Sequence, residues 1–232
     1  MPARLRPTAP IAADAVLVGD PGRALMLAQA LLEEPKMSNH ARGLWGYSGQ
    51  TPAGQPLSIQ ATGMGGPSAA LVLADLAELG VRRAIRVGTC VAIEPEPEPG
   101  DLLTVLEAHA WAGGGAGAAA LPDASLTARL REELGQATRP AIVASLDAPH
   151  RGGRVERAPY AERVDAADMQ TATLFSGAKD LDLAIAAVLI VAESAAGDQA
   201  DDDRIEAAAK VGGAAASAAL FQRPDPKAEV EG

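Results

Sequence analysis

The sequence predicts an α/β sandwich around a largely parallel or mixed central sheet, organised as one domain over residues 1–232. Two observations predict this fold class. Short apolar runs rich in Val, Ile and Leu alternate with longer stretches whose apolar residues recur at helical spacing. The apolar runs are also continuous, with few polar residues interleaved, which is typical of strands that are buried on both faces of a sheet.

The individual elements follow in order from these patterns and from the turn residues between them. We expect strands at 14–18, 44–50, 56–62, 84–88, 102–106, 140–145 and 184–192. We expect helices at 22–33, 66–79, 125–136, 166–180 and 202–221. Pro67 suits the start of the second helix, where its missing N–H is not needed, and Gly80 suits its end. The Ala- and Gly-rich stretch 111–117 predicts a flexible surface loop, and 222–232 predict a frayed tail.

Charge and cysteine content narrow the classes of function. The formal net charge of −10 argues against a surface for nucleic acid or for an anionic membrane. The single cysteine, Cys90, excludes an internal disulfide and a multi-cysteine metal site, and we expect no metal. We find neither a secretory signal nor an apolar run long enough to span a bilayer. These features predict a cytoplasmic enzyme.

Three glycine-containing strand ends predict a cradle for an anion. Gly19 follows the first strand, the segment 63–66 (GMGG) follows the strand at 56–62, and Thr89 follows the strand at 84–88. Glycine allows close approach of the backbone, and Arg23 adds a planar cation that suits phosphate. Arg86 interrupts an otherwise apolar strand, so its charge must find a partner or a ligand.

These segments also carry a resemblance to a known family. The order GDPGR at 19–23, NHARG at 39–43, GMGGPS at 63–68 and IRVGTC at 85–90 resembles the nucleoside phosphorylase family of uridine phosphorylase and hexameric purine nucleoside phosphorylase. The segment 168–175 (DMQTATLF) is similar to a later motif of that family. The resemblance is strong over 14–110 and weaker afterwards.

The resemblance implies a three-layer α/β/α sandwich with a central mixed sheet. It implies phosphorolysis of a nucleoside to free base and (deoxy)ribose 1-phosphate, with inorganic phosphate as co-substrate and no cofactor. It also implies a homodimer or a hexamer built from three dimers, in which Arg42 reaches into the phosphate site of the neighbouring subunit.

The resemblance assigns a role to each matching residue. Gly19, Arg23, Arg42, Arg86 and Thr89 match the phosphate binders, and Met169 and Gln170 match the pair that contacts ribose. Cys90, Val91 and His150 fall at the base pocket. Arg86 and Glu193 are the candidate catalytic residues, with Asp198 as an alternative to Glu193 for protonation of the leaving base.

The chain departs from the family mainly in the half of the site that holds the nucleoside. Gln170 stands where the family has a glutamate, Asp168 is a shortened form of the preceding acid, and Val91 stands where glycine is usual. Neither the aspartate of the purine enzymes nor the arginine of the uridine enzymes is found near Glu193, and the N-terminal histidine of the family has no counterpart before Gly19.

Three functions remain open from the sequence. The chain is a phosphorylase with an unusual nucleoside pocket, a weak or inactive relative that binds phosphate or nucleoside, or a hydrolase that uses water. The arginines argue against the hydrolase, because water needs no cationic cradle. Replacement of Gln170 by Glu separates the first two, because it should raise the activity of an impaired phosphorylase and should not help a rebuilt site.

Overall fold

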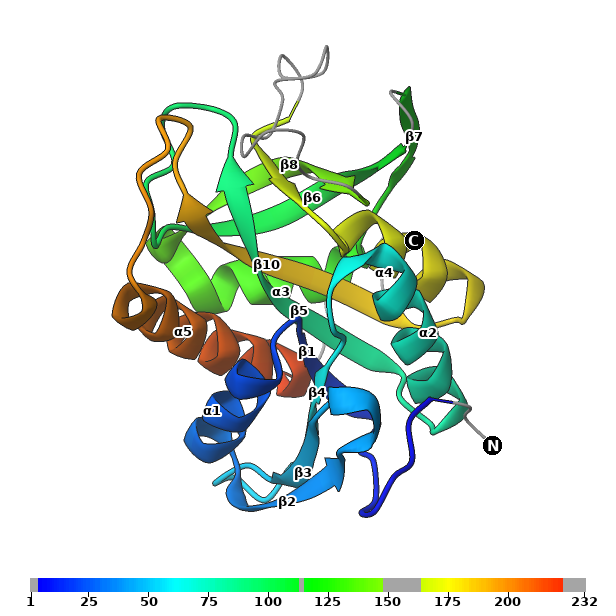
Figure 1. Cartoon of the computed structure of the whole chain (residues 1–232). Coiled ribbons are helices and arrows are strands. Elements are labelled where there is room, and N and C mark those ends of the chain that lie inside the picture. Colours follow the sequence, from blue (N-terminus) through cyan, green and yellow to red (C-terminus); the bar gives the residue numbers. More distant parts are fainter. Residues whose placement is uncertain (1–3, 113–114, 148–163, 223–232) are drawn as a thin grey trace, which may run out of the picture.

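The computed structural model describes residues 4–112, 115–147 and 164–222, and these form a mixed sheet covered by helices on both faces (Figure 1). Strands pair in the order β10-β6-β8-β9-β5-β1-β4-β3-β2, and β7 pairs with β6. Parallel pairs (β1 with β4 and β5, β5 with β10, β6 with β8) occur beside antiparallel ones (β2 with β3, β3 with β4, β6 with β10). The prediction of a central mixed sheet is therefore confirmed.

The elements of the first half of the described chain are β1 (Asp14–Val18), α1 (Pro21–Leu31), β2 (Glu33–Asn39), the 3-10 turn η1 (Ala41–Gly43), β3 (Gly46–Gln50), β4 (Pro56–Ala61), α2 (Gly65–Glu78) and β5 (Arg83–Ala92). The second half contains β6 (Leu102–Ala112), β7 (Gly115–Ala120), α3 (Ala124–Leu134), the 3-10 turn η2 (Gly135–Ala137), β8 (Thr138–Leu146), β9 (Ala166–Asp168), α4 (Thr171–Asp180), β10 (Ala184–Glu193) and α5 (Asp202–Phe221). None of these helices is long and apolar enough to cross a membrane.

Part of the sheet closes on itself. β5 pairs with β10, β10 with β6, β6 with β8, β8 with β9, and β9 returns to β5. β5 makes this closure possible because it is long: its first half pairs with β1, and its second half pairs with β9 through Val91 and Ala167. The same strand therefore links the open side of the sheet to the closed side.

Two apolar clusters hold the helices against the sheet. Residues of α2 and α4, including Leu73 and Phe175, form one cluster with one face of the sheet. Residues of α1, α3 and α5, including Leu27 and Leu130, form the second cluster on the other face. Figure 1 shows α2 and α4 on one side of the strands and α1 and α5 on the other. The predicted three-layer arrangement is confirmed.

The predicted helix at 166–180 is wrong in its first part. Residues Ala166–Asp168 form β9, and helix α4 begins only at Thr171. The segment is rich in alanine and favours a helix locally, but here β9 pairs with β5 and β8, and the Asp168 carboxylate accepts the backbone N–H of Thr171. Tertiary pairing overrides helix propensity at this position.

The Ala- and Gly-rich stretch is more ordered than expected. β6 extends to Ala112, and β7 begins at Gly115 and pairs with it, so the predicted loop is wrong at 111–112 and 115–117, and residues 113–114 lie outside the described residues. Backbone hydrogen bonds to an existing strand do not require side chains, which explains a strand of Gly and Ala. β2 was missed because its polar sequence has no strand-like alternation. Within the predicted tail, residues 223–232 lie outside the described residues.

Two adjacent glycines of α5 give a matched test of helix packing. A Cβ added at Gly213 would lie 2.6 Å from the buried Leu27 side chain of α1, whereas one added at Gly212 meets only ordinary contacts at 3.4 Å. We expect Gly213→Ala to lower the free energy of unfolding by about 1–3 kcal/mol through overpacking. Gly212→Ala should be neutral or stabilising by up to about 1 kcal/mol. Urea denaturation of both variants measures this, and equal effects would contradict the packing of α5 on α1.

Candidate active site

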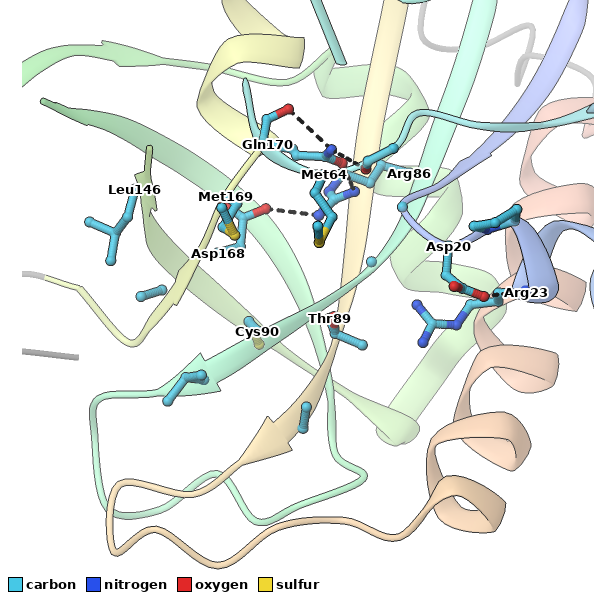
Figure 2. A pocket seen from close by; sticks show the side chains of 18 residues that line it. Asp20, Arg23, Met64, Arg86, Thr89, Cys90, Leu146, Asp168, Met169 and Gln170 are labelled. Atoms are coloured by element: carbon cyan, nitrogen blue, oxygen red, sulfur yellow. Dashed lines mark hydrogen bonds and ion pairs between the residues drawn. The ribbon is translucent and has the colours of Figure 1, made fainter. Parts of the chain in front are cut away.

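A cavity with a volume of about 610 Å³ opens where the carboxyl ends of β1, β4 and β10 meet the middle of β5. Parallel strands bring their carboxyl ends to one edge of a sheet, and ligands bind there in open α/β folds. The residues that line it are Gly19, Asp20, Pro21, Arg23, Gly63, Met64, Gly65, Arg86, Gly88, Thr89, Cys90, Val91, Leu146, Ala167, Asp168, Met169, Gln170 and Ala192. Figure 2 shows Arg23 and Asp20 at one end and Leu146 and Met169 at the other.

Arg23 supplies the charge of the polar end. Asp20 caps helix α1 by accepting the Arg23 backbone N–H at 2.8 Å, and this places the Arg23 side chain at the cavity. Burial lowers the pKa of the Arg23 guanidinium, the Asp20 carboxylate opposes this effect, and the charge of Arg86 adds to it. Within the described part of the chain, the Arg23 guanidinium has neither a hydrogen bond nor an ion pair. It is therefore a partly desolvated cation that an anion would stabilise.

Arg86 has the partner that its place in an apolar strand demands. Its Nη2 lies 3.0 Å from Asp168 Oδ2, its Nη1 donates to Gln170 Oε1 at 2.7 Å, and its Nε donates to Thr171 Oγ1 at 3.2 Å. Asp168 also accepts the hydroxyls of Thr171 and Ser145. An arginine has five N–H groups, and among the described residues these three bonds leave two of them without a partner.

Gln170 is 2% exposed and connects Arg86 to the loop after β4. Its Nε2 donates to the carbonyl of Gly63 at 2.7 Å and to that of Gly65 at 3.2 Å. Its Oε1 also lies 3.0 Å from the Thr62 hydroxyl. The Gln170 side chain thus contacts Arg86 at the polar end of the cavity through its oxygen, and the loop after β4 through its nitrogen.

The other end of the cavity is apolar. Val91, Leu146, Met169 and Ala192 line it, and Met64 stands beside it with 86% of its surface exposed. Burial raises the pKa of the Cys90 thiol, and the nearby Asp168 charge adds to the effect. Cys90 therefore stays protonated and is unsuited to act as a nucleophile.

The structure brings together most of the predicted site residues. Those that line the cavity are Gly19, Arg23, Arg86, Thr89, Cys90, Val91, Met169 and Gln170. Arg42 lies outside it, exposed on η1, and Glu193 also lies outside it, where its carboxylate accepts a hydrogen bond from Gln199. His150 lies outside the described residues.

Sequence reasoning missed three residues of the network around Arg86. The hydroxyls of Thr62, Ser145 and Thr171 contact Gln170 or Asp168. Thr171 gave a signal, because it follows Asp168 by three residues, the spacing of a carboxylate that accepts a backbone N–H at the start of a helix. Thr62 and Ser145 gave none, because their roles depend on how separate strands meet.

The family follows from comparison of the whole chain. A sequence model described as "Phosphorylase superfamily" matches residues 14–221. The chain belongs to the phosphorylase superfamily. The recognition made from the motifs at 19–23, 63–68 and 85–90 is confirmed.

Curated relatives and a solved structure support the same placement. The chain is 44% identical over 94 residues to the DeoD-type purine nucleoside phosphorylase of Oceanobacillus iheyensis, and 40% identical over 102 residues to that of Geobacillus kaustophilus. The first match covers 40% of each chain, and the second covers 44% of this chain and 43% of its relative, so less than half of either is aligned. The crystal structure of purine nucleoside phosphorylase from Toxoplasma gondii in complex with immucillin-H has a TM-score of 0.79, with 19% identity over 90% of both chains. That likeness establishes the fold.

Gly88 is the residue that gives the Arg86 side chain its room. A Cβ at position 88 would lie 2.5 Å from Arg86 Cζ and 2.6 Å from its Nη2. We expect Gly88→Ala to displace the guanidinium from Asp168 and to lower the free energy of unfolding by about 3 kcal/mol or more, the usual cost of breaking a buried ion pair. Chemical denaturation measures this. Gly177→Ala is the control, because among the described residues its Cβ would meet only Leu73, at 3.4 Å. Stability of Gly88→Ala equal to that of the control would contradict this geometry.

Proposed function

We propose that this protein catalyses phosphorolysis of a nucleoside. A phosphate oxygen forms a bond to the anomeric carbon as the bond from that carbon to the base nitrogen breaks, giving (deoxy)ribose 1-phosphate and free base. The observation that carries the proposal is the Arg23 guanidinium, a partly desolvated cation facing the cavity without a partner among the described residues. Membership of the phosphorylase superfamily and the similarity to purine nucleoside phosphorylases support it.

The phosphate is held at the polar end of the cavity in this proposal. Arg23, the two N–H groups of Arg86 that are unused among the described residues, and the Thr89 hydroxyl surround this end, close to the N-terminus of α1 and Gly19. Cations and helix N-termini stabilise a phosphate dianion and hold it for attack. Phosphate is the co-substrate, and the reaction needs no cofactor.

The nucleoside lies toward the apolar end in this proposal. Met169 packs against the sugar, and Cys90 and Val91 shape the space for the base, with His150 as a further candidate. The branched side chain of Val91 narrows this space relative to the glycine expected from the family resemblance. Because of this narrower space, we propose that the substrate is an unusual nucleoside. We also propose that the protein acts in the cytoplasm.

One observation favours a second candidate, a phosphate- or nucleoside-binding protein with weak or no turnover. Among the described lining residues the only carboxylates are Asp20 and Asp168, and Asp168 is buried in its ion pair with Arg86. Glu193 remains the proposed acid for the leaving base, although it does not line the cavity. A nucleoside whose base leaves without being protonated would not require an acid such as Glu193 at the cavity.

Release of free base from a panel of purine, pyrimidine and 5′-modified nucleosides, with and without phosphate, separates these functions. We expect release that depends on phosphate. Release without phosphate would indicate the hydrolase, and phosphate binding with no release would indicate the binding protein.

Arg23→Ala gives a sharper test than a change at Arg86, because Arg86 also neutralises a buried carboxylate. We expect Arg23→Ala to lower kcat/KM for phosphate by about 10- to 100-fold, the effect of one hydrogen bond to a charged group. Its stability should be unchanged, because the guanidinium has no partner among the described residues. Arg139→Ala is the control, since Arg139 pairs with Glu96 at the surface. An unaltered phosphate dependence in Arg23→Ala would overturn the assignment.

We also propose that the active unit is a homodimer or larger assembly in which Arg42 serves the neighbouring site. Arg42 is exposed on a turn held by Asn39, whose side chain donates to the Leu44 carbonyl, and it has a left-handed backbone with φ of 60°. Such a conformation is unfavourable for a non-glycine residue and is often found at functional positions.

Co-expression of two impaired variants tests this sharing. Arg23→Ala and Arg42→Ala should each be impaired alone. In a mixed dimer one site carries both lesions and the other carries neither, so random pairing should restore about a quarter of the sites in a symmetric dimer. Activity of the co-expressed pair no greater than that of the separate variants would contradict the proposal.

A further inference from the structure

Hydrogen-bond donors and acceptors lie on different sides of the Gln170 side-chain amide. Arg86 Nη1 donates to its oxygen at 2.7 Å, and the Thr62 hydroxyl lies 3.0 Å from the same oxygen, with its one proton shared between Gln170 and the Val18 carbonyl. Acceptors face its nitrogen: the carbonyl oxygens of Gly63 at 2.7 Å and Gly65 at 3.2 Å. The two N–H groups and the oxygen of the amide are therefore all used within the protein.

This arrangement accepts an amide in one orientation only. A reversed amide would place its N–H groups against the guanidinium and its oxygen against the two carbonyls. A carboxylate would keep the contact with Arg86 but would turn its second oxygen toward Gly63 and Gly65, where it has nothing to donate. The site is matched to glutamine rather than to glutamate at this position.

The loop that Gln170 holds leads into helix α2, whose first residues Gly65 and Gly66 are buried, and few side chains of the described residues fix its shape before that point. Gly63 and Gly65 have positive φ of 73° and 80°, a region in which glycine has no strong preference of its own. Met64 between them is 86% exposed and contributes little packing. The Ser68 hydroxyl donates to the Thr62 carbonyl at the start of the loop, and the Gln170 amide fixes the carbonyls on both sides of Met64.

We propose that Gln170 is a positioning residue, which ties the Gly63–Met64–Gly65 loop to Arg86 and so holds the anion cradle in its binding shape. Its amide is not a ligand for the sugar. The replacement of the family's glutamate is therefore a rebuilt contact and not a weakened one. The link to phosphate rests on the proposed function, whereas the tie between loop and guanidinium does not.

Gln170→Glu tests the tie with an isosteric change. In the absence of ligands we expect it to lower the Tm by about 4–8 °C, because two donated hydrogen bonds are lost and two carbonyls lose their partner. In hydrogen exchange, the backbone amide of Thr62, which donates to the Val18 carbonyl at 2.7 Å where the loop begins, should lose protection. Leu134→Ala is the matched control: Leu134 is a buried residue of α3 that lines no part of the cavity, and its truncation should lower the Tm by a similar amount.

Phosphate binding separates a positioning role from a merely structural one. We expect inorganic phosphate to raise the Tm of the wild type and of Leu134→Ala alike. In Gln170→Met, which removes the amide and adds no charge, the apparent affinity for phosphate should fall by about tenfold, because the Arg86 guanidinium and the loop no longer hold each other. If Gln170 were instead a ligand for the sugar, its replacement would leave the affinity for phosphate alone unchanged.

Two results would overturn the proposal. One is a Gln170→Glu variant whose Tm and exchange at the Thr62 amide equal those of the wild type. The other is a gain in phosphorolysis of ribonucleosides over their 2′-deoxy counterparts in this variant, which would make position 170 a sugar contact. If phosphate fails to stabilise the wild type, the proposed function fails, and the unliganded Tm and exchange still decide whether the tie exists.

Discussion

The buried ion pair between Arg86 and Asp168 is the interaction on which the rest of the site depends. The two side chains are 5% and 0% exposed, and burial of either charge alone would be strongly unfavourable. The strand that carries Arg86 and the short strand that carries Asp168 must therefore form together. The closure of the sheet achieves this, because β9 pairs with β5 through Val91 and Ala167. The topology and the charges of the site are thus parts of one constraint.

The sequence predicted those elements whose signals are local. Asp20 and Asp201 cap α1 and α5, and both helices lie close to their expected bounds. β2, β7 and β9 were not predicted, because each exists through its pairing partner. β9 has the composition of a helix, β7 has side chains too small to show a period, and β2 is polar and mostly exposed at the edge of the sheet. Periodicity cannot report a strand of these kinds.

The sequence could predict which residues come together at the cavity, but not how their side chains and backbone groups are arranged there. The rule that parallel strands deliver their carboxyl ends to one edge was sufficient to bring Gly19, Arg23 and Thr89 to one cavity. The sequence could not predict which of two adjacent residues at the end of β10, Ala192 or Glu193, faces the cavity. A register shift between Val191 and Glu193 lies there, and Ala192 lines the cavity while Glu193 does not. The direction of the Gly63 and Gly65 carbonyls also depends on backbone angles that no side-chain pattern encodes.

The neutral side chain at position 170 has an electrostatic consequence beyond its hydrogen bonds. The cavity is lined by two guanidiniums, Arg23 and Arg86, and by two carboxylates, the buried Asp168 and the exposed Asp20. A further carboxylate at position 170 would give these groups a net negative charge, in a protein whose formal net charge is already −10. An amide accepts the same guanidinium N–H without adding negative charge. Gln170 therefore fixes Arg86 in place and leaves the field of Arg23 and Arg86 available to an anion, a combination that a glutamate at this position could not provide.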